Sequence, residues 1–271
     1  MTPGKYSGLI ALELNIASGF VRNVLKLLDE GATIPFIARY RKEMTGSMDE
    51  TVITHIRDRV RRLRDLDARK ETILNSLKEQ DKLTPELEIA VNEATTLSDL
   101  EDIYLPYKPR RKTRAVIARE KGLEPLARII MSQKYDDVEA KALKFVDPGK
   151  GINDEKAAID GACDIIAEWV NENGFGRRSI RRLYHQEGFL CSAIIKGKEQ
   201  EGINYKDYYD FRELLRRAPS HRVLAIFRGE NESFLRVTVE VSPDKAFEVL
   251  EDIFIKEKNR SSELVAGSIR D

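Results

Sequence analysis

Cysteine and histidine are scarce in this sequence, and what is missing narrows its chemistry. The 271 residues include 2 cysteines and 3 histidines. Cys163 and Cys191 form no CxxC pattern, and His55, His185 and His221 lie far apart in the chain. Two cysteines are too few to suggest a disulfide framework, and the sequence lacks the closely spaced Cys and His residues of a zinc site. We therefore expect a protein of a reducing compartment, with no metal and no cofactor.

Long hydrophobic runs are also missing. No stretch approaches the 18 apolar residues that a membrane helix needs, and the first residues, MTPGKYSG, lack the apolar core of a secretion signal. The sequence therefore predicts a cytoplasmic protein without a membrane partner.

The usual catalytic signatures are not found either. The sequence contains no HExxH, GxSxG or P-loop pattern. Acidic residues gather at positions 79 to 102, with eight acids against one lysine, which is typical of solvated helix faces. A nuclease fragment is a conceivable alternative, but no carboxylate constellation for a metal supports it. We expect a protein that is not an enzyme.

What the sequence does contain is a series of helical patterns, which predicts a mainly α fold. Residues 10 to 31 resemble a helix-turn-helix, with Asn15 in the turn and Gly31 ending the second helix. Residues 47 to 50, SMDE, read as a capping box that opens one long helix to about Gln80. The apolar stripe of that helix is interrupted at residues 67 to 70, so its partner surface is expected to change there. Residues 98 to 101, SDLE, read as a second capping box, which opens the turn before Tyr104. A multi-helix array follows.

Strand character begins only near the C-terminal end. Residues 189 to 196 and 234 to 241 are rich in β-branched and aromatic residues, and we expect them to pair as a small two-stranded antiparallel element. A polar stretch and a helix pair broken at Pro219 are expected between them. This change of period predicts two domains, an all-helical one at 1–188 and a mixed α/β one at 189–271.

Positive charge is concentrated locally, although 46 basic and 46 acidic residues cancel overall. Residues 105 to 121 hold seven basic residues against one acid, and the LPYKP stretch at 105 to 109 reads as extended chain that presents Tyr104 and Tyr107. Cations mixed with aromatic rings are typical of nucleic-acid sites. A linker whose arginines bridge to the acidic 79–102 helices fits equally well. The candidate binding residues of this segment are Tyr107, Lys108, Arg110, Arg111, Lys112 and Arg114.

A second basic group directly follows an apolar anchor in GATIPFIARYRK at residues 31 to 42. We expect Phe36 and Ile37 to be locked in a core. Arg39, Arg41 and Lys42 are then held rigidly, either to meet a phosphate backbone or to clamp acids of neighbouring helices. The clamp is the favoured interpretation for the two arginines, and Lys42 is expected to stay free.

Three other basic groups are weaker candidates. Arg57, Arg61 and Arg64 share one face of the long helix with nearby aspartates, which favours an ion-paired surface. The arginines at 177, 178, 181 and 182 fit a partner-binding face and an ion-paired face equally. The second helix of the helix-turn-helix offers only Arg22 and Lys26, too few to favour reading of a major groove.

Several long motifs closely resemble the Tex family of bacterial transcription accessory proteins. They are GATIPFIARYRKEMTGSMDE at 31–50, LEDIYLPYKPRRKTRAVIAREKGLEPLA at 100–127, DPGKGINDEKAAIDGACDIIAE at 147–168 and APSHRVLAIFRGENESFLRV at 218–237. Members of this family are cytoplasmic and about three times as long. The resemblance implies that this chain corresponds to their N-terminal region, and that an RNase H-like domain without nuclease residues, helix-hairpin-helix motifs and an RNA-binding OB-fold follow in longer members.

The resemblance and the basic segments together predict a non-enzymatic, nucleic-acid-binding transcription accessory protein. Its nucleic-acid partner is expected to be RNA or DNA bound without sequence specificity, with RNA polymerase or a transcription complex as a possible protein partner. The alternative is a scaffold for protein–protein contacts, in which the long helix and its arginine rows meet the transcription machinery or other domains of a longer protein.

Overall fold

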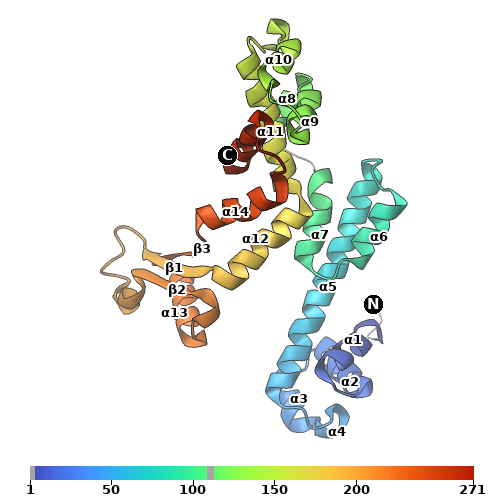
Figure 1. The fold of residues 1–271 in the computed structure, drawn as a ribbon. Coiled ribbons are helices and arrows are strands. Elements are labelled where there is room, and N and C mark those ends of the chain that lie inside the picture. The colour runs from blue at the N-terminus through green and yellow to red at the C-terminus, as the bar shows by residue number, and fades with distance from the viewer. Residues whose placement is uncertain (1–3, 109–112) are drawn as a thin grey trace. The chain divides into compact units, whose positions relative to one another are not determined.

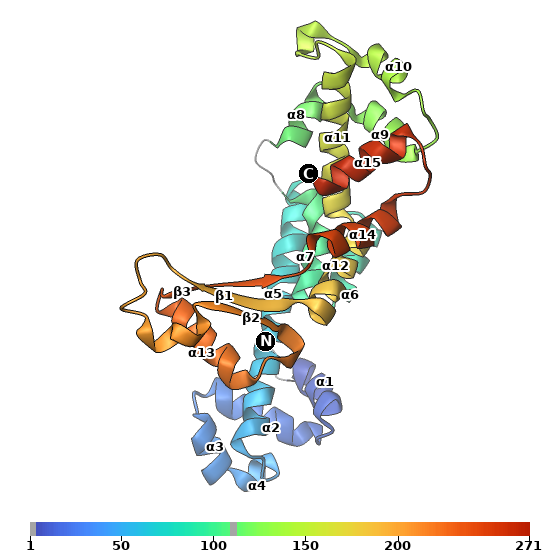
Figure 2. The same cartoon turned by 60° about the vertical axis from the view of Figure 1, so that its left-hand side comes forward.

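The computed structural model describes residues 4–108 and 113–271, and most of them are helical. The chain divides into two units, Met1–Tyr107 and Lys108–Asp271. Figures 1 and 2 show the elements of both units from two directions. The mainly α fold that the sequence predicts is confirmed. The domain boundary expected near residue 188 lies between a helix that ends at Glu187 and a strand that begins at Phe189. That this point separates two domains stays a prediction.

The first unit is built along one long helix. Its elements are α1 (Gly4–Leu14), α2 (Ser18–Asp29), α3 (Ile34–Tyr40), α4 (Lys42–Thr45), α5 (Glu50–Glu79), α6 (Pro85–Glu93), α7 (Leu97–Tyr104) and a 3₁₀ turn, Leu105–Tyr107. In both views, α1 to α4 surround the first half of α5, whereas α6 and α7 lie beside its second half (Figures 1 and 2).

Two separate hydrophobic cores form along α5. Ile53, Ile56 and Val60 pack into a cluster with buried residues of α1, α2 and α3. Leu66 and Ile73 instead belong to a cluster with α6 and α7. The predicted change of partner along the helix is therefore confirmed. The polar residues at the change also link elements, since Asp67 accepts a hydrogen bond from Tyr6 of α1 at 2.7 Å and Arg69 donates one to Glu101 of α7 at 2.6 Å.

Left-handed backbone shapes the turn between α1 and α2 and the turn between α4 and α5. Asn15, between α1 and α2, has the positive φ of 53° that its turn position predicts. Gly46 ends α4 with φ 66°, and a Cβ there would lie 2.7 Å from the Phe20 ring. Asn15 thus turns the chain from α1 into α2, and Gly46 turns it from α4 towards α5.

Two expected helix starts in this unit are wrong by a few residues. The N-cap of α5 is Asp49, whose side chain accepts from the Val52 amide, while Ser47 has φ 59° and lies outside the helix. Thr96, rather than Ser98, caps α7. Aspartate and threonine oxygens both satisfy the first free amides of a helix, so sequence spacing alone did not distinguish the competing caps.

The second unit contains a helical group followed by a small sheet. Its regular elements are α8 (Arg114–Glu120), α9 (Glu124–Ser132), α10 (Val138–Ala142), α11 (Glu155–Glu172), α12 (Gly174–Glu187), β1 (Phe189–Ile194), β2 (Asp210–Leu214), α13 (Ser220–Asn231), β3 (Leu235–Glu240), α14 (Pro243–Phe254) and α15 (Arg260–Arg270). Short 3₁₀ turns lie at Leu143–Phe145, Pro148–Lys150, Ile203–Tyr208 and Leu215–Arg217.

The core of the second unit surrounds α11. Ala158, Ala162, Ile165 and Ile166 are fully buried there, with partners from α8, α9, α10 and α15. Gln133, directly after α9, is fully buried as well, and its side chain bonds to the segment between α14 and α15. The small residues of α11 let these helices approach closely, which explains why one helix can serve as the centre.

The sheet has three antiparallel strands in the order β2-β1-β3. The predicted antiparallel pairing of residues 189 to 196 with residues 234 to 241 is confirmed, with Cys191 of β1 opposite Thr238 of β3. Strand β2, whose Arg212 lies opposite Cys191, was not expected, because residues 210 and 211 were assigned to the polar stretch and the residues after them to the helix pair. Helix α13 packs directly on the sheet through its buried face, which includes Ile226 and Gly229. Gly229 lies so close to β3 that a Cβ there would be 2.7 Å from the Leu235 side chain.

Candidate nucleic-acid interface

Helix α3 is short but firmly anchored. Pro35 fits its first turn, where a missing N–H costs nothing. Ile37 is fully buried and Ala38 nearly so, both within the core shared by α1, α2 and α5. Beyond α3, the buried Thr45 donates its hydroxyl hydrogen bond to the Arg41 carbonyl at 3.0 Å. The backbone from residue 37 to residue 45 is therefore held at both ends.

Two aromatic rings lie on the outside of this anchored segment. The exposed fraction is 39% for Phe36 and 67% for Tyr40. Their ring centroids are 5.5 Å apart, with an angle of 41° between the ring planes. The i, i+4 spacing places both on one side of α3, next to the buried face that Ile37 forms. The prediction that Phe36 is locked in the core is therefore wrong, although it is correct for Ile37.

Three cations, Arg39, Arg41 and Lys42, lie next to the two rings in the chain, and Arg41 contacts one of them. The guanidinium carbon of Arg41 lies 5.0 Å from the Phe36 ring centre, and Arg41 donates a hydrogen bond to the Tyr40 carbonyl at 3.2 Å. Arg39 is 3.7 Å from a carboxylate oxygen of Glu50, but its side chain remains 69% exposed. Among the described residues, Arg41 and Lys42 form no ion pair. We call Phe36, Arg39, Tyr40, Arg41 and Lys42 the aromatic–cation surface.

The clamp expected for the two arginines is only partly present. The contact between Arg39 and Glu50 does link α3 to the start of α5, but it is long and exposed, a geometry that contributes little stability. Arg41 uses an aromatic ring in place of a carboxylate. Lys42 is exposed at the start of α4, as expected. One acid, Glu43, follows these three cations directly in the chain, so residues 39 to 43 keep a positive balance.

The second predicted binding segment, which begins at residue 105, differs from its expected conformation in the residues that the structure describes. Residues 105 to 107 form a 3₁₀ turn that continues α7, so the expected extended chain is wrong there. Leu105 adopts helical angles despite the proline after it, because packing of α7 outweighs that local preference. Tyr107 is half-buried against the α5–α7 core and Lys108 is exposed. Arg110, Arg111 and Lys112 lie outside the described residues.

Tyr104, expected as a stacking surface, is buried. Its exposed fraction is 6%, and its hydroxyl shares a 2.8 Å hydrogen bond with Ser76 of α5. The guanidinium of Arg69 lies 5.7 Å from its ring centre. This ring therefore belongs to the core between α5 and α7, and is not available to a nucleic acid.

The cations around α8 are largely neutralised within the second unit. Arg114 pairs with Asp271 and, at 3.3 Å, with Asp164. The hydrogen bond to Asp271 and the nearby Asp164 charge raise the pKa of Arg114. Arg119 pairs with Glu168 and Glu124. Arg114 is therefore a weaker binding candidate than the sequence suggested.

The arginines of α5 are mostly ion-paired, which agrees with the interpretation favoured for them. Arg57 pairs with Asp58 at 2.7 Å and Arg64 with Asp29 at 2.8 Å. Arg59, which the sequence analysis did not single out, donates two hydrogen bonds to Glu13 of α1. Arg61, in contrast, is exposed and has no partner among the described residues.

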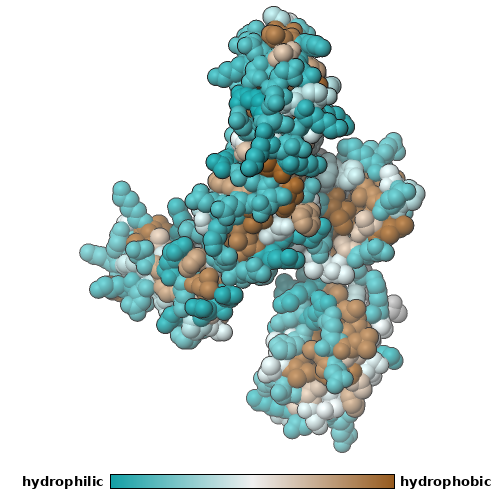
Figure 3. Space-filling model, viewed as in Figure 1, coloured by the Kyte–Doolittle hydropathy of each residue, from teal (hydrophilic) through white to brown (hydrophobic). Residues whose placement is uncertain are grey.

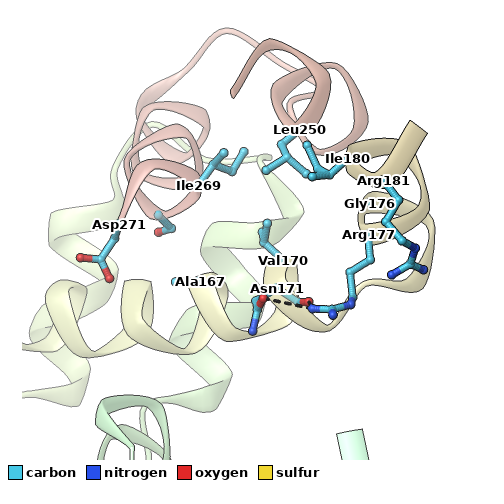
Figure 4. Close-up of a pocket in the computed structure, with 11 residues that line it drawn as sticks. Ala167, Val170, Asn171, Gly176, Arg177, Ile180, Arg181, Leu250, Ile269 and Asp271 are labelled. Atoms are coloured by element: carbon cyan, nitrogen blue, oxygen red, sulfur yellow. Dashed lines mark hydrogen bonds between the residues drawn. The ribbon is translucent and has the colours of Figure 1, made fainter. Parts of the chain in front are cut away.

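Two of the arginines of α12, Arg177 and Arg181, border a pocket of about 530 Å³ between α11, α12, α14 and α15. Figure 4 shows its apolar walls, with Arg177 and Arg181 on the α12 side. Arg177 donates a hydrogen bond to the Asn171 carbonyl at 3.3 Å. The lining residues are Ala167, Val170, Asn171, Gly176, Arg177, Ile180, Arg181, Leu250, Ser268, Ile269 and Asp271.

Within residues 4–108 and 113–271, no group of three or more His, Cys, Asp or Glu side chains is placed to hold a metal ion. None of the helices in the described part of the chain combines the length and the apolar character needed to cross a bilayer.

Comparison with known proteins finds two family matches. Residues 5–78 match the family model described as Tex-like protein N-terminal domain, and residues 133–267 match the one described as Tex central region-like. The second match begins at Gln133 and runs through the sheet to α15.

Full-length relatives are similar across most of this chain. Protein tex of Bordetella pertussis is 46% identical over 235 residues, which cover 87% of this chain and 30% of that protein. Protein YhgF of Escherichia coli is 42% identical over 90% of this chain and 31% of its own length. The transcriptional accessory protein Tex of Neisseria gonorrhoeae is 41% identical over 87% and 31%. The chain thus spans about a third of the length of these curated relatives.

Proposed function

Because the chain belongs to the Tex family, we propose that it is a non-enzymatic part of a transcription accessory protein and contacts nucleic acid through the aromatic–cation surface of α3 and α4. A relative is named a transcriptional accessory protein, which supports a role close to nucleic acid. We further propose that it acts in the cytoplasm, beside RNA polymerase.

One observation carries this proposal: three cations stand on an anchored segment with little internal neutralisation. Arg41 and Lys42 pair with no carboxylate among the described residues, and Arg39 has only the long contact with Glu50. Held cations lose little entropy when they meet a phosphate backbone, and they release the counterions condensed there. The ion-paired arginines of α5 and α8 lack this availability.

Labelled oligonucleotides titrated with the whole chain test the proposal. At each salt concentration from about 50 to about 200 mM, we expect the affinity of the variant Arg39→Gln/Arg41→Gln/Lys42→Gln to be on the order of tenfold lower than that of the wild type. Arg61→Gln/Arg62→Gln/Lys78→Gln is the matched control, because it removes the same charge from exposed residues of α5 that have no partner among the described residues. Its affinity should stay within about twofold of the wild type.

Two results would contradict the proposal. Undetectable binding at low salt would favour the protein–protein scaffold, and equal losses in both variants would mean that only general charge matters. The segment around residue 110 is tested in parallel with Arg110→Ala/Arg111→Ala/Lys112→Ala. Incubation with labelled nucleic acid and magnesium should give no cleavage above a protein-free control, as expected for a protein that is not an enzyme.

A further inference from the structure

We infer that the aromatic–cation surface binds single-stranded polynucleotides by stacking bases on Tyr40 and Phe36, and so prefers single strands to duplexes. The inference rests on the proposed function, and adds the class of nucleic acid and the residues that select it. It follows from the exposure of the two rings beside three cations, which simple phosphate binding does not require.

The rings are placed as a stacking platform. Tyr40 is 67% exposed at the end of a helix whose other face is fixed by Ile37. A tyrosine has only two side-chain torsions, so it offers a large flat surface at low entropic cost. The 41° angle between the Phe36 and Tyr40 planes leaves them as two neighbouring faces rather than one closed stack. Each base added to such a ring gains stacking energy whatever its sequence.

Arg41 extends the platform. Its guanidinium lies 5.0 Å from the Phe36 ring centre, and its hydrogen bond to the Tyr40 carbonyl keeps it there. A guanidinium plane stacks on bases as well as on rings, and its charge attracts the adjacent phosphate. Arg39 and Lys42 flank the rings along the chain. Bases and phosphates of one strand therefore find complementary groups within seven consecutive residues.

A duplex can contact the cations of the aromatic–cation surface but cannot stack its bases on the two rings. Its bases are stacked inside the helix and paired, so exposed rings reach them only after unstacking, which costs a few kcal/mol per base. Its phosphates still meet the three cations. Duplex affinity should consequently depend on charge alone, whereas single-strand affinity should depend on charge and rings together.

The surroundings also fit a polyanion better than an apolar partner. Arginine and lysine stand between and beside the two rings in residues 36 to 42, and Figure 3 shows hydrophilic residues next to hydrophobic ones on the surface of α1 to α4. Arg22 belongs to α2, a helix in contact with α3 and α4, and it is also exposed and has no partner among the described residues. Charge complementarity therefore selects a nucleic-acid strand as the occupant.

Fluorescence anisotropy with single strands and a duplex of equal length tests the inference in the whole chain. We expect Tyr40→Leu to lower single-strand affinity on the order of tenfold and to leave duplex affinity unchanged. Tyr40→Phe, which keeps the ring, should remain near wild type. Tyr184→Leu removes another exposed tyrosine, in α12, and should have no effect. Parallel RNA and DNA strands identify which sugar the surface accepts.

The two proposals fail in different ways. If Tyr40→Leu and Phe36→Leu leave single-strand affinity unchanged while the triple cation variant weakens it, stacking is overturned and the proposed function stands. If no oligonucleotide binds the wild type, both are overturned. Far-UV circular dichroism of each variant establishes that it is folded, which we expect because the Tyr40 ring is largely outside the core.

Discussion

Single residues decide which side chains are available in this protein. Ile37 and Phe36 are neighbours in one apolar run, yet Ile37 is fully buried and Phe36 is 39% exposed. On a helix, adjacent residues point about 100° apart, so a run of apolar letters cannot be buried throughout on a one-sided helix. The exposed ring was missed because the run was read as a unit. The i, i+4 spacing of Phe36 and Tyr40 was the available signal.

In the second unit, a single side chain, that of Gln133, holds several segments of the chain together. It is fully buried in a left-handed conformation with φ 55°. Its side-chain amide donates to the Phe254 carbonyl at 2.7 Å and accepts from the Lys256 amide at 2.8 Å and from the Ser262 hydroxyl at 3.1 Å. One side chain thus fixes the segment between α14 and α15.

Replacing this side chain should be costly. Gln133→Leu leaves several buried polar groups without partners, so we expect the free energy of unfolding to fall by about 2 to 5 kcal/mol. Urea unfolding followed by the fluorescence of Trp169, which packs on the same core, measures it. Gln186→Leu, at an exposed position of α12, is the control and should change stability by less than about 0.5 kcal/mol. Equal effects of both would contradict the role of Gln133.

At the scale of elements, the start of α5 offers the clearest test. Asp49 accepts from the Val52 amide at 2.8 Å, and Ser47 stands outside the helix with positive φ. We expect Asp49→Ala to lower stability by about 1 kcal/mol. Ser47→Gly should be neutral or slightly stabilising, because glycine tolerates that backbone conformation better. Thermal unfolding followed by circular dichroism compares them, and a larger loss for Ser47→Gly would restore the capping box that the sequence suggested.

The elements themselves were largely predictable, and the reasons for the exceptions are physical. Apolar periodicity located α5 and its change of partner, and β-branched runs located β1 and β3. Strand β2 was not found, since DFREL alternates weakly and gains its pairing from β1. Tyr104 and Arg114 were misjudged for a related reason: their partners, Ser76 and Asp164, are distant in sequence.

For the whole molecule, the balance of 46 basic and 46 acidic residues means that affinity for nucleic acid must be local. Each phosphate contact with a single strand contributes about 0.7 to the slope of log K against log salt. The slopes of the wild type and the triple variant at Arg39, Arg41 and Lys42 should therefore differ by about 2, as measured by titration at several salt concentrations. A difference near zero would show that these cations touch no phosphates.

The length of α5 also has an electrostatic consequence. Arg39 approaches Glu50, the first residue of this helix, whereas the acidic α7 joins it at Arg69, where Glu101 pairs. At 1.5 Å per residue these points are about 28 Å apart, more than three Debye lengths at physiological ionic strength, roughly 8 Å each. Salt therefore screens the negative charge around α6 and α7 before it reaches a strand bound at α3 and α4. Within the first unit, a polyanion can thus be attracted at α3 and α4 although acidic helices belong to the same unit.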